Sequence, residues 1–135
     1  MDHSPFNGAK LLLTQRGMML TYLRDDFAHL PYPSHWDLPG GGREGHETPI
    51  ECALRELDEE FSLNLSADRL TGREFPSAHQ PGAVSWLFIG QLTRAEITTI
   101  QFGNEGQRWC MMPITDYLRH PQAIPHFQRW IRHVL

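Results

Sequence analysis

Short apolar runs separated by a polar turn fill the first part of the chain. Residues 9–14 (AKLLLT) and 18–23 (MMLTYL) are mostly apolar and flank a Gln-Arg-Gly segment. We interpret them as the two strands of a hairpin, with Gly17 at the turn position that needs a permissive backbone. A buried helix remains an alternative, because periodicity alone does not separate the two structures in runs this short. Residues 24–35, interrupted by two prolines, are expected to form a loop.

An amphipathic helix is predicted to begin near residue 49. Thr48 and Glu51 form a Thr-x-x-Glu capping box, and Pro49 suits the first helical position. The apolar positions that follow recur at helical spacing and define one stripe, made of Ile50, Ala53, Leu54, Leu57 and Phe61. This stripe forms one apolar face of the predicted helix.

The second half of the chain predicts further strands and a terminal helix. Strands are expected at residues 70–75, 84–92 and 107–114. Residues 93–106 show no regular period and are interpreted as a loop. A helix is expected to begin within 113–118, and another over 123–135, with Pro125 in its first turn. Strands on either side of helices fit a mixed sheet covered by helices.

Composition and charge narrow the classes of protein that fit. The chain has 135 residues, 40% of them hydrophobic and 21% charged, which fits one globular domain over residues 1–135. The formal net charge of −4 argues against broad binding of nucleic acid. No secretory pattern opens the chain, and no apolar run approaches the roughly 20 residues of a spanning helix. We therefore expect a cytoplasmic protein without a membrane span.

A cluster of carboxylates lies on a second face of the predicted helix. Glu56, Glu59 and Glu60 are spaced i, i+3 and i+4, so they project from the same side. Like charges at this spacing destabilise a helix by roughly 0.2–0.5 kcal/mol per pair. A hard divalent cation, Mg²⁺ or alternatively Mn²⁺, would neutralise the cluster. The competing interpretation is a solvated acidic face without a ligand.

The spacing around these glutamates matches a known pattern. Gly41 is followed after five residues by Glu47, and seven residues later the sequence reads Arg-Glu-Leu-Asp-Glu-Glu-Phe-Ser-Leu over 55–63. This arrangement resembles the Nudix box, and the preceding Leu-Pro-Gly-Gly segment agrees with it. One position departs, because Ser62 stands where the family has glycine. The chain therefore resembles Nudix hydrolases of the MutT-like kind.

The departure at Ser62 concerns local geometry and removes no carboxylate. The family glycine ends the helix in a conformation that suits glycine best, the left-handed one. A serine in that conformation should cost on the order of 1 kcal/mol. Ser62 is therefore expected to adopt a left-handed backbone at the end of the helix.

The resemblance implies a fold and an activity. The fold would be an α/β/α sandwich with a mixed β-sheet between helices. The activity would be Mg²⁺-dependent hydrolysis of a nucleoside diphosphate linked to another moiety, by water attack on phosphorus. Substrates would be (d)NTPs, including oxidised or otherwise modified nucleotides. The alternatives are hydrolysis of ADP-ribose, nucleotide sugars or dinucleoside polyphosphates, or a Nudix module that binds nucleotide without turnover.

The resemblance also assigns roles within the box. The metal ligands would be Glu56, Glu59 and Glu60, with Glu60 ranked first and Glu56 second, and one of them could serve as general base. The backbone carbonyl of Gly40 would be a further ligand. Glu47 and Arg55 would form an ion pair that orients the loop and the helix. No organic cofactor is implied.

Features outside the box complete the expectations. The segment 102–109 (FGNEGQRW) resembles the loop that brings a further glutamate to the metals in MutT-like members, which makes Glu105 a candidate base or ligand. A solvent-exposed loop glutamate is the alternative. Substrate specificity is expected in the loops at 25–35, 74–82 and 93–105. The resemblance leaves open a homodimer, for which the sequence shows no interface.

Overall fold

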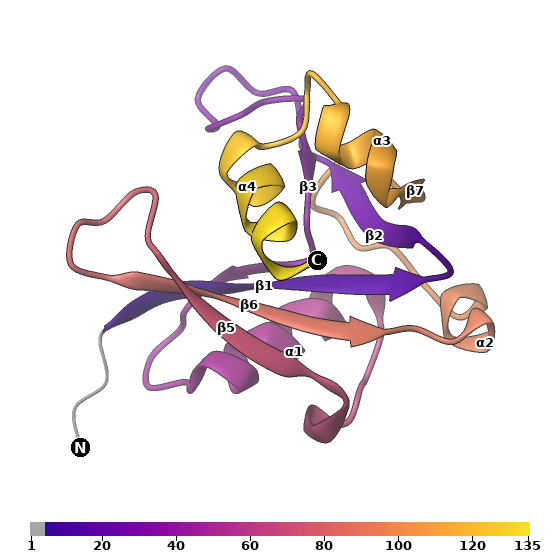
Figure 1. Cartoon of the computed structure of the whole chain (residues 1–135), viewed down its shortest axis with the longest axis horizontal. Helices are drawn as coiled ribbons and strands as arrows, with labels where there is room; N and C mark the ends of the chain where they lie inside the picture. The colour runs from indigo at the N-terminus through magenta and orange to yellow at the C-terminus, as the bar shows by residue number, and fades with distance from the viewer. Residues whose placement is uncertain (1–4) are drawn as a thin grey trace.

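A mixed seven-stranded sheet lies between helices in the computed structural model, which describes residues 5–135 (Figure 1). The strands are β1 (Phe6–Gln15), β2 (Met18–Leu23), β3 (Trp36–Asp37), β4 (Gly40–Gly42), β5 (Thr71–Pro76), β6 (Val84–Gln91) and β7 (Arg108–Pro113). Their order is β3-β2-β1-β6-β5, with β4 also paired to β1 and β7 to β2. β1 runs parallel to β6, and the other pairs are antiparallel. This confirms the predicted mixed sheet.

The first two strands form the predicted hairpin. Thr14 pairs with Met19 and Gln15 with Met18, so the connection has only two residues. Both of these residues have a positive φ, 51° at Arg16 and 78° at Gly17. Such two-residue turns match the twist of the flanking strands. The alternative of a buried helix in this region is therefore wrong.

The helices are α1 (Pro49–Phe61), α2 (Arg94–Thr98), α3 (Ile114–Arg119) and α4 (Pro125–Val134), with one 3₁₀ turn at Ala67–Arg69. The predicted capping box of α1 is present. Thr48 accepts a hydrogen bond from the Glu51 amide, and the Glu51 side chain accepts one from the Thr48 amide. The terminal helix also has its proline in the first turn, as predicted.

α2 corrects the interpretation of residues 93–106 as a loop. It has only five residues, too few for an apolar period to be visible. Its start is nonetheless marked by a second capping box, formed by Thr93 and Glu96. Glu96 also forms an ion pair with Arg69 from the 3₁₀ turn. Local capping, the ion pair with Arg69 and the packing of Ile97 against the core on the α1 side therefore define this short helix.

The sheet separates two apolar cores because neighbouring residues of a strand point to opposite faces. On β1, Leu11 and Leu13 pack toward α1, whereas Leu12 packs toward α3 and α4. β6 repeats the alternation, with Phe88 on the α1 side and Leu87 on the other. Figure 1 shows α1 on one side of the sheet and α3 and α4 on the other. The structure is therefore the α/β/α sandwich that the resemblance implied.

The glycine-rich strand β4 connects the sheet to α1. β4 pairs with β1 and lies directly against the helix. A Cβ atom added to Gly41 would come within 2.7 Å of the carboxyl group of Glu56. Only glycine therefore allows a carboxylate of α1 to approach the backbone of β4 this closely.

Membrane insertion by a helix is not supported within residues 5–135, where every helix is too short or too polar to cross a bilayer.

Candidate functional site

Three glutamates of α1, Glu56, Glu59 and Glu60, line one small cavity. Its volume is about 180 Å³, and the chain also contributes Glu105 and its neighbours Gly103 and Asn104, together with Glu44. The glutamates differ in exposure: the side chain of Glu59 is 58% exposed and that of Glu56 15%, whereas Glu60 is 7% exposed as a residue. The helical face that they share is therefore exposed to solvent at Glu59 and largely buried at Glu56 and Glu60. The structure brings Glu105, which lies far away in the sequence, to the same cavity.

Glu60 is the buried carboxyl group of this cavity. Its Oε1 accepts a hydrogen bond from the Gly40 amide at 2.8 Å. Burial raises the pKa of Glu60 to about 8, although the charge of Lys10 and the Gly40 bond oppose the shift. Near neutral pH this carboxyl group would keep its proton unless positive charge approached it. A bound cation would supply that charge and ionise the group.

Arg55 joins the glutamates to the loop that precedes α1. Its Nε donates to Glu47 Oε2 at 2.5 Å, and its Nη2 donates to Glu47 Oε1 at 3.1 Å and to the Gly42 carbonyl at 2.9 Å. Its Nη1 donates to Glu56 Oε1 at 2.8 Å and to Glu59 Oε2 at 3.3 Å. The bond from Arg55 is the main reason that the pKa of Glu47 is lowered. The structure thus contains the Glu47–Arg55 pair that the resemblance implied.

The bonds of Gly40 differ from the role that the resemblance implied for its carbonyl oxygen. Its carbonyl oxygen accepts a hydrogen bond from Lys10 Nζ at 3.1 Å. Its amide, rather than its carbonyl, bonds to Glu60. The atom predicted as a metal ligand is therefore already bonded to an ammonium group, and Gly40 positions Glu60 through its amide.

The residues of the cavity fit a hard divalent cation. No group of three or more His, Cys, Asp or Glu side chains in residues 5–135 forms a ready-made cage. Mg²⁺ does not require one, because it retains several waters and takes one or two carboxylates with substrate phosphates. The buried Glu60, whose pKa is raised mainly by burial, and the neighbouring Glu56 and Glu59 supply oxygen atoms of the kind that such a cation binds.

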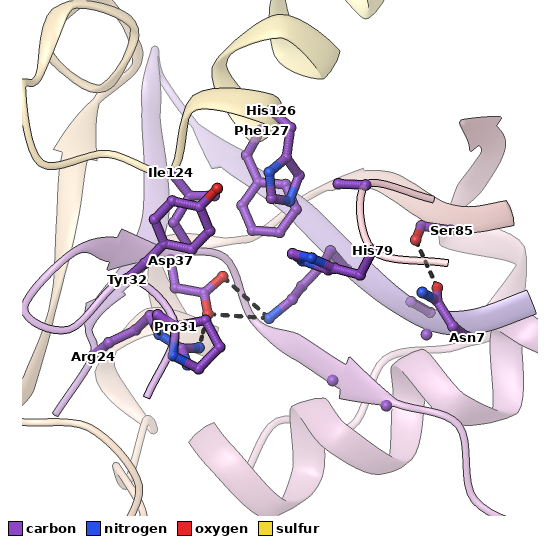
Figure 2. A pocket seen from close by; sticks show the side chains of 16 residues that line it. Asn7, Arg24, Pro31, Tyr32, Asp37, His79, Ser85, Ile124, His126 and Phe127 are labelled. Carbon is purple, nitrogen blue, oxygen red and sulfur yellow. Dashed lines mark hydrogen bonds and ion pairs between the residues drawn. The ribbon is translucent and has the colours of Figure 1, made fainter. Parts of the chain in front are cut away.

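A second cavity, of about 210 Å³, adjoins β4, and Figure 2 shows its side chains. Asp37 lies at the polar end of this cavity, is 1% exposed and accepts hydrogen bonds from three residues. Lys10 Nζ, Arg24 Nη1 and the Tyr22 hydroxyl each donate to Asp37 Oδ2, at 3.2, 3.0 and 2.9 Å. Burial, followed by the charge of Asp37, raises the pKa of Tyr22. Two cations are thereby fixed beside the glycine-rich strand.

Aromatic rings form the other wall of this second cavity. His126 of α4 contacts Tyr32 and His79 from two separate loops, with ring centroids 6.1 and 5.5 Å apart. Phe127 of α4 lines the cavity beside them. Burial, followed by the charge of His79, lowers the pKa of His126 to about 4. The wall is therefore uncharged at His126 near neutral pH, and it suits a flat ring.

A third cavity, of about 310 Å³, shares residues with the other two. Arg24 lines both it and the aromatic cavity, and Glu105 lines both it and the glutamate cavity. A ligand could therefore extend from the aromatic wall past a guanidinium group to the glutamates. Such an arrangement suits a molecule with a ring at one end and phosphates at the other.

Sequence reasoning missed most of the aromatic cavity. The loops at 25–35 and 74–82 were expected to carry specificity, and they do contribute Tyr32 and His79. The contribution of α4 was not foreseen, because its side chains follow an ordinary helical period. Lys10 and Asp37 could have been noticed, since each is a charged residue within or beside an apolar strand.

Comparisons with known proteins match the chain to a domain family and to several relatives. The sequence profile of the NUDIX domain matches residues 5–133. A putative 8-oxo-dGTP diphosphatase 3 of Mycobacterium tuberculosis is 55% identical over 38 residues, covering 28% of this chain and 17% of that protein. The 8-oxo-dGTP diphosphatase of Proteus vulgaris is 37% identical over 59 residues, covering 38% of this chain and 53% of that protein. The chain thus spans about half, or less, of these curated relatives.

Solved structures share the fold. A MutT protein from Methanosarcina mazei superimposes with a TM-score of 0.74 at 16% identity, covering 98% of this chain and 95% of that one. The Nudix hydrolase RenU of Mycobacterium smegmatis superimposes with a TM-score of 0.69 at 22% identity, covering 98% and 87%. At identities of 16% and 22%, these similarities show a shared fold.

Proposed function

This chain is a member of the Nudix family, and we propose that it hydrolyses a nucleoside diphosphate linked to another moiety with the help of a divalent cation. One observation carries the proposal. The buried carboxyl group of Glu60 shares a cavity with Glu56, Glu59 and Glu105, and burial raises its pKa to about 8, which supports a site where a cation would favour the ionised form. Mg²⁺ or Mn²⁺ together with substrate phosphates would complete this site.

Glu56, Glu59 and Glu60 would hold the cation, which would screen the phosphates and lower the pKa of a bound water. The Gly40 amide holds the carboxyl group of Glu60 in place, and Arg55 does the same for Glu56 and Glu59. Phosphoryl transfer depends mainly on stabilising the charge of the phosphates. The bonds from Gly40 and Arg55 would hold the carboxylates in position for the cation that supplies this stabilisation, so little reorganisation would be needed.

In the reaction, the oxygen of a water molecule bonds to one phosphorus and the bridging P–O bond of the anhydride breaks. The leaving phosphate takes the electron pair of that bond. The water proton passes to a carboxylate, for which Glu60, Glu56 and Glu105 are the candidates in this cavity. Glu105 approaches from a separate loop, so it could act as base while the glutamates of α1 serve as ligands.

The aromatic cavity suits the nucleoside part of the substrate. Tyr32, His79 and Phe127 offer ring faces, while Arg24 lies between this cavity and the one that contains Glu105. A polyanionic substrate needs such local cations, because the chain carries a net charge of −4. The relatives named for 8-oxo-dGTP hydrolysis support (d)NTPs, including oxidised ones, as the substrates to test first.

The test is a product-release assay over a panel of nucleoside triphosphates, modified nucleotides, ADP-ribose, nucleotide sugars and dinucleoside polyphosphates. It compares Mg²⁺ with EDTA, and wild type with Glu60→Gln and Glu105→Gln. We expect turnover of at least one nucleotide only with metal, and a loss of at least about 100-fold in Glu60→Gln. Asp116→Asn is the matched control, since it removes one carboxylate from an exposed position on α3, away from the glutamate cavity.

Two outcomes would redirect the proposal. Calorimetric binding of a nucleotide without any metal-dependent product would favour a binding module over an enzyme. Unchanged turnover of Glu105→Gln at saturating Mg²⁺ would remove Glu105 from the reaction and leave the glutamates of α1 as the candidate bases.

A further inference from the structure

A fourth cavity opens on the α1 side of the sheet. Its volume is about 610 Å³, larger than each of the three cavities described above, and within residues 5–135 it shares no lining residue with any of them. Cavities of about 300–1,000 Å³ that are mainly apolar, with a few polar groups, are typical of small-molecule sites. The apolar residues that line this cavity are Pro5, Phe6, Pro49, Ile50, Trp86 and Phe88.

Two nearly parallel rings form one wall of the fourth cavity. Trp86 and Phe88 are two residues apart on β6 and therefore point to the same face of the sheet, with ring centroids 5.7 Å apart and 14° between the planes. They lie over Gly72 of β5, where an added Cβ atom would come within 2.8 Å of the Phe88 ring and 3.0 Å of the Trp86 ring. Glycine thus lets both rings lie close to the neighbouring strand. This flat surface suits a planar aromatic ligand.

Charged groups of opposite sign lie on either side of Trp86 in this cavity. Glu74 of β5 is paired directly opposite Trp86. Arg43 lies beyond the other neighbour of β6, because its amide donates to the Asn7 carbonyl of β1 and its guanidinium group lies 4.4 Å from the centre of the Phe6 ring. β6 lies between β1 and β5 in the sheet. A ring stacked on Trp86 would therefore have the guanidinium group at one end and the carboxylate at the other.

Arg43 and Glu74 are available to a ligand. No ion pair within residues 5–135 uses either of them. Glu47, the other carboxylate that lines the cavity, differs because both of its oxygens already accept hydrogen bonds from Arg55. A guanidinium group pairs well with a carboxylate or a phosphate, and a carboxylate accepts hydrogen bonds from ring N–H groups.

We propose that the fourth cavity binds a planar nitrogen heterocycle that carries an anionic group. The ring would stack on Trp86, the anionic group would accept hydrogen bonds from Arg43, and Glu74 would accept one from a ring N–H. Purine nucleotides and indole carboxylic acids share this chemistry. The inference stands independently of the proposed function, because none of the residues that line this cavity lines the glutamate cavity.

The experiment is a ¹H–¹⁵N NMR titration of the full chain in EDTA, with indole-3-acetate as the first probe. Trp86→Phe identifies the indole signal of Trp86 among those of the four tryptophans. We expect indole-3-acetate to shift this signal, with a dissociation constant of about 1 mM or tighter for a ligand of this size. An unchanged Trp86 signal, or a dissociation constant weaker than about 10 mM, would overturn the inference.

Matched ligands test the two charged contacts separately. Indole-3-acetamide replaces the carboxylate by a neutral amide, and 1-methylindole-3-acetate lacks the ring N–H. Each should bind the wild type about 5-fold more weakly than indole-3-acetate. Arg43→Gln should remove most of the difference between acid and amide, and Glu74→Ala should remove most of the difference between the N–H and N-methyl rings.

Arg73→Gln is the matched control, because it removes a positive charge from an exposed position of β5 outside this cavity, and it should retain both differences. Differences that persist unchanged in Arg43→Gln and Glu74→Ala would overturn the inference, since the binding would then involve only the apolar surface.

A second titration, with GMP in EDTA, distinguishes the two sources of this chemistry. A Trp86 shift by GMP that weakens in Arg43→Gln but not in Arg24→Gln would support the inference and assign the cavity to nucleotides, because Arg24 lines the candidate site instead. A Trp86 shift by indole-3-acetate alone would support it and assign the cavity to aromatic acids. A Trp86 signal that neither probe shifts would reject it.

Discussion

Ser62 ends α1 in a backbone conformation that glycine adopts at little cost. Its φ and ψ are 56° and 36°, the left-handed region predicted for this position, and its amide donates to the Asp58 carbonyl at 2.9 Å. A side chain pays on the order of 1 kcal/mol for this conformation. The Ser62 hydroxyl recovers little of that cost, since its bond to the Gln101 carbonyl is long, at 3.3 Å, and exposed.

Ser62→Gly should therefore stabilise the protein by about 0.5–1 kcal/mol with activity retained, because glycine removes the conformational cost. Thermal unfolding of purified protein measures this. Ser62→Ala is the matched control, because it keeps the cost and loses the hydroxyl, and it should not stabilise. A lower melting temperature for Ser62→Gly than for wild type would contradict the explanation.

Among the elements, α1 is joined to the loop and strand that precede it by several bonds of one arginine, Arg55. Arg55 uses its whole guanidinium group on Glu47, Glu56, Glu59 and the Gly42 carbonyl. Lysine has the same charge but cannot make this fork of bonds. The pairing explains how glutamates that repel one another remain on one helix before a cation is bound.

Arg55→Lys is expected to lower either the apparent Mg²⁺ affinity or the turnover by about 10- to 100-fold, as for other residues that orient metal ligands. The measurement is the rate as a function of Mg²⁺ concentration. Arg69→Lys provides the control, because Arg69 forms a comparable pair with Glu96 away from the glutamates. Similar losses in both variants would show that the effect of Arg55 is general rather than specific to the site.

At the scale of the whole molecule, α4 and two distant loops meet at His126. Tyr32, His79 and Trp130 surround its ring. Burial, then His79 and Arg129, lower the pKa of His126 from 6.5 to about 4, although Asp37 opposes this. The folded protein therefore binds a proton at His126 only well below the pH at which the unfolded chain does.

Stability should consequently fall as the pH decreases from about 6.5 to 4, because the unfolded state binds the proton first in this window. The expected loss from this residue is up to about 3 kcal/mol. Urea unfolding of wild type and His126→Phe at pH 7 and pH 4.5 measures it, and the variant should lose less stability. His133→Gln, at an exposed position of the same helix, is the control. Equal losses in wild type and His126→Phe would refute the assignment.

Much of the framework was predictable because its signals are local. The hairpin at Gly17, the capping box of α1 and the left-handed Ser62 depend on neighbouring residues in the chain, and all were confirmed. The box spacing likewise indicated the family, and the NUDIX profile over residues 5–133 confirms it. The short helix α2 was missed because five residues show no period, although its own Thr93–Glu96 capping box was visible in the sequence.

The sequence by itself determined which side chains could carry the chemistry, since helical spacing places Glu56, Glu59 and Glu60 on one face of α1. Only the tertiary structure decided that Glu60 is buried, that Glu105 enters the same cavity and that His126 lines a cavity with Asp37. The physical reason is that spacing depends on local backbone geometry, whereas burial and the resulting pKa shifts depend on segments brought together only when the sheet and helices pack.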